Sequence, residues 1–147
     1  AKAVQYAEQA VNDAPTNAVY RGNYGIMLYR NLRWSEAIDQ FRFALNGGRT
    51  DDDQEIVGLS LDLNDLRTIE YYYTYGLALA RQNECGDALQ IVQNLQSKVR
   101  SNEDAMAAAD RTIEICEENL KNPATATPIP EVEETSTPEM TETPLPN

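Results

Sequence analysis

The sequence predicts an all-α domain of about six helices, stacked as helical hairpins and followed by a disordered tail. Three observations lead to this prediction. Apolar residues recur at helical spacing through most of residues 1–121, the breaks between these segments are short with one exception, and small residues recur at fixed shifts along the chain. The 147 residues are enough for one domain with a substantial core.

The first three helices follow from periodicity and turn residues. An alanine-rich stripe ends at Val11 and is followed by a turn that contains Pro15. We expect the next two helices over about 18–30 and 35–46, and Ser35 could cap the second of them.

Three further helices are expected after a longer break. The first begins at residue 64 or 65 and runs to about 82, the second spans about 86–98, and the third runs from 101 or 102 to about 121. Glu103 and Asp104 in the first turn of the third helix complement the positive end of its dipole.

Small residues recur at equivalent places in two of the predicted hairpins. A shift of 51 residues places Gly25 on Gly76 and Ala37 on Ala88, and this shift equals a period of 34 plus an insertion of 17. Glycine inside a helix costs about 0.5–1 kcal/mol relative to alanine, so two at equivalent positions need a reason. Close packing of paired helices is such a reason. An unrelated helical bundle with coincident glycines is the alternative.

With these residues the chain resembles the tetratricopeptide repeat (TPR) family, whose pattern is W-x2-L-G-x2-Y, then A-x3-F, then a proline. The repeats are divergent, one contains the insertion, and only Pro15 keeps the terminal proline. The matching structural positions are Tyr24, Gly25, Leu28, Ala37, Phe41 and Ala44 in one copy, and Tyr72, Tyr75, Gly76, Leu79, Ala88 and Val92 in the other. The resemblance covers about residues 1–121 and implies a right-handed α-α solenoid, as a fragment of a longer chain.

The resemblance also implies where a partner would bind, because the first helix of each pair in this family lines a concave groove that receives a peptide or partner helix. The partner-binding residues so implied are Val19, Ile26, Tyr29 and Arg30 from one repeat, and Glu70, Tyr73, Leu77 and Arg81 from the next. Apolar residues stand where some members clamp a terminal carboxylate, so we do not expect that specialised function. The alternative is a tyrosine-rich surface covered by neighbouring repeats.

Residues 47–63 form an inserted, acidic segment. Its spacing fails the EF-hand calcium pattern, since Ile56 replaces the glycine and Asp62 replaces the final glutamate. Between Val57 and Leu63, apolar residues alternate with period two, which predicts an extended piece with one edge packed on the helices.

The two cysteines, Cys85 and Cys116, are expected to lie level with each other. In an antiparallel hairpin, two residues lie level with each other when they are equally far along the chain from the centre of the loop. With a loop near residues 99–102, Cys85 and Cys116 meet this condition. We therefore expect a disulfide, with two buried free thiols as the alternative.

The predicted disulfide and the tail favour an extracytoplasmic protein, with a cytoplasmic one as the alternative. Residues 122–147 carry six of the seven prolines, six threonines and five glutamates, a composition typical of disordered linkers and exported stalks.

Composition excludes several function classes. The net charge of −12 disfavours nucleic-acid binding, because the phosphate backbone is also negative. Histidine is absent, so the commonest general base is missing. Two cysteines alone cannot complete a structural zinc site. No apolar run is long enough to span a membrane. We expect neither a cofactor nor an enzyme, but a scaffold that binds a protein or peptide. The alternative is an architectural or dimerisation domain of a larger exported enzyme or transport assembly, which includes a homo-oligomer.

Overall fold

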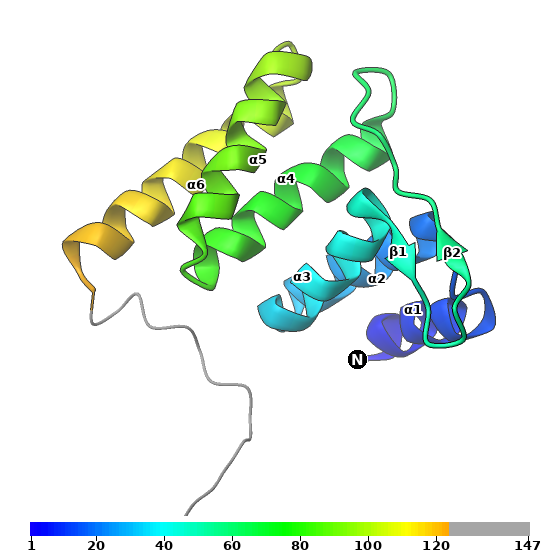
Figure 1. Cartoon of the computed structure of the whole chain (residues 1–147). Coiled ribbons are helices and arrows are strands. Elements are labelled where there is room, and N and C mark those ends of the chain that lie inside the picture. Colours follow the sequence, from blue (N-terminus) through cyan, green and yellow to red (C-terminus); the bar gives the residue numbers. More distant parts are fainter. Residues whose placement is uncertain (124–147) are drawn as a thin grey trace, which may run out of the picture.

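The computed structural model describes residues 1–123, which form six α-helices packed in adjacent pairs (Figure 1). The helices are α1 (Lys2–Asp13), α2 (Ala18–Arg30), α3 (Trp34–Phe41), α4 (Leu66–Arg81), α5 (Cys85–Lys98) and α6 (Glu103–Lys121). The mostly helical prediction is confirmed. The predicted disorder of residues 122–147 falls, beyond Asn122 and Pro123, outside the described residues.

Side-chain caps explain where three of the helices begin. Asn17, Asp65 and Asn102 accept hydrogen bonds from the backbone N–H three residues ahead, over 2.8–3.1 Å, and so satisfy donors that a helix start leaves free. The predicted cap at Ser35 is wrong, because α3 begins one residue earlier and Arg33 precedes it without a side-chain cap.

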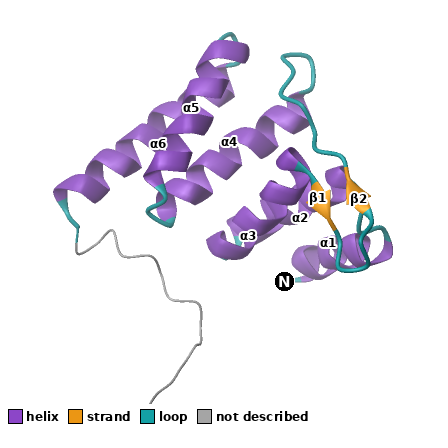
Figure 2. Ribbon diagram, in the orientation of Figure 1, coloured by secondary structure: helices purple, strands orange, loops and turns teal. Residues whose placement is uncertain are grey.

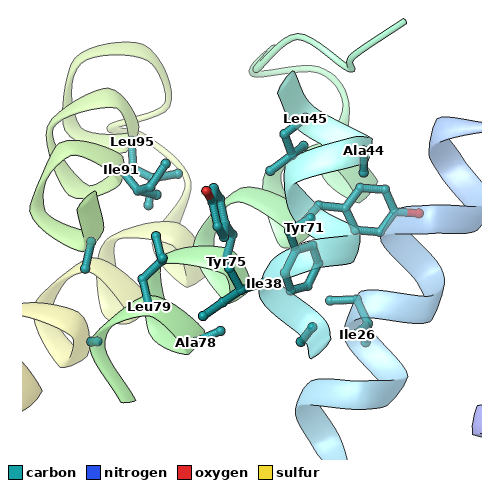
Figure 3. Close-up of a cluster of buried hydrophobic side chains, with 14 of the residues drawn as sticks. Ile26, Ile38, Ala44, Leu45, Tyr71, Tyr75, Ala78, Leu79, Ile91 and Leu95 are labelled. Atoms are coloured by element: carbon teal, nitrogen blue, oxygen red, sulfur yellow. The ribbon is translucent and has the colours of Figure 1, made fainter. Parts of the chain in front are cut away.

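The core lies between the two central hairpins (Figure 3). The ring of Phe41, from the end of α3, is fully buried, with its centroid 6.5 Å from that of Tyr71 and 6.0 Å from that of Tyr75 on α4. Ile91 and Leu95 of α5 lie on the other side of Tyr75, while Ile26 of α2 closes the opposite end of the cluster. α4 therefore joins the two halves of the domain.

The two repeated glycines both lie under apolar side chains of the following helix. The three atoms nearest to a Cβ added at Gly25 all belong to the Phe41 ring, the closest at 2.7 Å. At Gly76 the nearest side chain is that of Ile91, whose Cγ2 would lie 3.2 Å from the added Cβ. Val92, the predicted repeat position next to Ile91, is also buried in the core.

The remaining repeat positions are buried, with one exception. Tyr72 is half-buried and donates its hydroxyl to the Leu59 carbonyl over 3.3 Å, so it holds the inserted segment against α4. The buried positions are Tyr24, Leu28, Ala37, Ala44, Tyr75, Leu79 and Ala88.

The insertion contains a short β-hairpin, which the sequence did not predict (Figure 2). A π-helical turn, η1 (Arg42–Asn46), continues α3 and leads into strands β1 (Gly48–Arg49) and β2 (Glu55–Ile56). The strands are antiparallel, with Gly48 opposite Ile56. Gly47 makes the entry turn at φ +76°, where a side chain would be strained and would meet the Ile56 carbonyl.

Beyond the hairpin, the predicted alternation holds only in part. Leu59 and Leu61 pack against the core, but Val57 and Leu63 are exposed, and the most buried residue of the segment is Ile56. Ile56 and Leu59 both face the core although their spacing is odd, so the alternation of side chains is broken between them. Gly58 lies at this break, in close contact with the Leu45 carbonyl.

The predicted disulfide is confirmed. Cys85 at the start of α5 is bonded to Cys116 near the end of α6, with 5.8 Å between their Cα atoms and a sequence separation of 31. Cys116 is buried and Cys85 half-buried, so the bond closes the open end of the α5–α6 hairpin.

Candidate functional site

The predicted partner-binding residues lie on α2 and α4, and two side-chain contacts connect those helices there. Arg81 Nε donates a hydrogen bond to the Tyr29 hydroxyl over 3.1 Å. Arg30 Nη2 lies 3.6 Å from Glu70 Oε2, in an ion pair that is largely exposed. Two pairs of predicted residues, far apart in the sequence, are thus brought into contact.

Tyr73 lies on the same face of α4 as Leu77 and Arg81, which follow it at helical spacing, and charges from three helices affect its phenol. Burial raises the pKa of its phenol, the negative charges of Glu70 and Asp104 raise it further, and Arg30 partly offsets them. Arg30 belongs to α2, Glu70 to α4 and Asp104 to α6. The half-buried phenol stays protonated at neutral pH and can donate a hydrogen bond to an acceptor on a partner.

Trp34 belongs to the same surface, although sequence reasoning did not select it. The guanidinium carbon of Arg81 lies 5.4 Å from the Trp34 ring centroid, within the range of a cation–π interaction. The Trp34 indole N–H is buried and has no acceptor among the described residues. Arg81 is therefore fixed by Tyr29 from α2 and by Trp34 from α3.

The structure places Ile26 and Val19 differently from the rest of the predicted set. Ile26 is buried in the core between α2 and α4, so it offers a partner little surface (Figure 3). Val19 is half-buried, and its carbonyl accepts a 3.1 Å hydrogen bond from the Tyr71 hydroxyl. The same hydroxyl lies 2.5 Å from Asn23 Oδ1, so its one proton is shared between two acceptors, and burial raises the pKa of Tyr71 to about 12. These contacts join the helices rather than form a surface.

We group the residues that remain available, together with Trp34, under the name α2–α4 face. It consists of Tyr29, Arg30, Trp34, Tyr73, Leu77 and Arg81. Tyrosine, tryptophan and arginine are the residues most enriched at binding hot spots. The predicted Glu70 holds Arg30 at the edge of this face.

No protein-family model, curated protein or solved structure matches the chain. None of the helices within residues 1–123 has the length and apolar character needed to cross a bilayer.

Proposed function

We propose that the chain is a non-catalytic scaffold of TPR-like repeats, and that its α2–α4 face binds a peptide or partner helix. The observation that carries the proposal is the fixed Tyr29–Arg81–Trp34 group beside the half-buried Tyr73 and Leu77. Such a surface is ordered before a partner arrives, so binding costs less side-chain entropy.

The proposed repeats form a right-handed solenoid in which α2, α4 and α6 are successive first helices. The contacts that support this arrangement are those of α4, which packs against α2 on one side and α6 on the other. The Asp104 charge near Tyr73 extends the proposed groove to α6. The Cys85–Cys116 bond supports an extracytoplasmic location, since disulfides persist in oxidising compartments.

The test is site-specific photo-cross-linking in cells of the source organism. Benzoylphenylalanine replaces Tyr73 in one variant and Tyr6 in a control variant. Tyr6 is 71 % exposed on α1 and so more accessible to chance collisions. We expect a defined cross-linked protein from position 73, which is absent from position 6 and lost when Leu77→Asp is added. Equal products from both positions would contradict the proposal.

A second candidate, an architectural or dimerisation domain, is favoured by one observation. Leu89 and Leu120 are 40 % and 83 % exposed beside the disulfide, where a shallow apolar pocket of about 470 Å³ lies between α5 and α6. Contacts between exported subunits would use this end. Sedimentation equilibrium of the oxidised chain tests it, since a dimer abolished by Leu120→Glu supports this candidate and a monomer at every concentration rejects self-association.

A further inference from the structure

The inserted hairpin closes one side of a second cavity, which shares no residue with the α2–α4 face. This cavity has a volume of about 480 Å³ and lies between α1, α2, the end of α3 and the hairpin tip. Figure 1 shows the hairpin reaching down from the end of α3 to α1. Sites for small ligands commonly have volumes of roughly 300–1,000 Å³, so the cavity has room for a ligand larger than a single ion.

One wall of the cavity holds a rigid guanidinium, that of Arg21. Its Nε and Nη2 both donate to the Pro15 carbonyl, over 3.0 and 2.9 Å, and its Nη1 donates to Gln40 Oε1 over 3.3 Å. The guanidinium carbon also lies 4.6 Å from the centroid of the Phe43 ring. These contacts fix the orientation of the group while using three of its five N–H donors.

No carboxylate lies within ion-pair distance of Arg21 among residues 1–123. Burial lowers the pKa of this guanidinium, and the more distant charge of Asp51 only partly offsets that effect. Arginine nevertheless stays charged at neutral pH. A fixed, partly desolvated cation with donors to spare favours a carboxylate from a ligand.

The other charged residues of the lining are mostly negative. Asp51 and Asp52 at the hairpin tip line the cavity, as does Glu8, which accepts a 3.0 Å hydrogen bond from the Tyr24 hydroxyl. The hairpin also contributes Arg49, whose charge is already paired with Asp53 over 3.2 Å. A simple anion would be repelled by these carboxylates, and a simple cation would be repelled by Arg21. Only a ligand that carries both charges satisfies both walls.

We propose that this cavity binds a zwitterionic ligand of the amino-acid or short-peptide class. The ligand carboxylate pairs with Arg21, and its ammonium group pairs with Asp51 and Asp52. Val11, Pro15 and the Phe43 ring supply an apolar surface for the ligand side chain.

The experiment compares three probes on the ¹⁵N-labelled, oxidised full chain. They are the dipeptide Leu-Ala, its N-acetyl derivative without the ammonium group, and its C-terminal amide without the carboxylate. We expect Leu-Ala to shift the amide resonances of the α1–α2 turn and hairpin tip saturably. Each blocked derivative should bind at least about tenfold more weakly, since each loses one charge-assisted contact.

Paired variants test which protein groups are responsible. The exposed pair Asp51→Asn/Asp52→Asn should weaken Leu-Ala binding about tenfold and remove its advantage over the N-acetyl derivative, without a change in melting temperature. The control pair Asp110→Asn/Glu114→Gln changes the net charge equally on the exposed side of α6 and should leave binding unchanged. Absence of saturable shifts at millimolar Leu-Ala, or equal binding of either blocked derivative, would overturn the proposal.

Discussion

Gly25→Ala is the substitution whose effect on stability follows most directly from the packing. The new methyl carbon would lie 2.7 Å from Phe41 Cε1 and 2.9 Å from Cδ1 and Cζ, well inside van der Waals contact. The ring cannot retreat, because it is fully buried and Tyr71 and Tyr75 lie beside it. Overpacking a core costs about 1–3 kcal/mol, and the helix gains about 1 kcal/mol from replacing glycine.

We therefore expect Gly25→Ala to lower the free energy of unfolding by up to about 2 kcal/mol, with a corresponding fall in the melting temperature. The assay is urea denaturation of the oxidised chain, followed by circular dichroism. Gly86→Ala is the matched control, since a Cβ there meets nothing within 4 Å and should leave stability unchanged or slightly increase it. Gly76→Ala should have an intermediate effect, because the new Cβ would lie 3.2 Å from Ile91 Cγ2. If Gly25→Ala were as stable as Gly86→Ala, the packing argument would be refuted.

Three other outcomes are expected from the same assay. Cys116→Ser should cost about 3–4 kcal/mol, because the disulfide closes a separation of 31 residues, and reducing the wild type should give the same loss. Asp65→Ala should cost about 1 kcal/mol by removing the cap of α4. Hydrogen bonds from Thr68 lower the pKa of Asp65. The stability that the ionised Asp65 contributes is therefore present above about pH 4 and is lost as the pH falls through its folded-state pKa. Asp65→Ala should remove this part of the decrease in stability at acid pH. Tyr71→Phe should cost about 1–2 kcal/mol by removing the one hydroxyl proton that Asn23 and the Val19 carbonyl share, and an unchanged unfolding midpoint would show that this hydroxyl contributes nothing.

The helices could be predicted from the sequence because their determinants are local. The bounds of α2 were predicted to the residue, and capping side chains set the starts of α4 and α6. The disulfide was predictable for a related reason, since an antiparallel hairpin fixes which residues lie level. The close packing at Gly25 was likewise predictable, because a glycine recurs inside a helix at an equivalent place of the other hairpin.

What could not be predicted depends on contacts between segments far apart in the chain. Each strand of the hairpin between Gly48 and Ile56 has only two residues, which is too short to produce an alternating pattern in the sequence. The burial of Ile26 is caused by the packing of α4 on α2, which a helical pattern on α2 alone does not reveal. Trp34 was missed because its counterpart at the shift of 51 is Cys85, so no repeated residue marked the position.

The most direct test of the account is the affinity of the cross-linked partner for two tyrosine variants. Isothermal titration should show that Tyr73→Ala weakens binding at least about tenfold, because an aromatic residue in a binding surface contributes a large share of the affinity. Tyr6→Ala removes a more exposed tyrosine outside the α2–α4 face and should change the affinity by less than about twofold. Equal affinities for the two variants would contradict the claim that this face binds the partner.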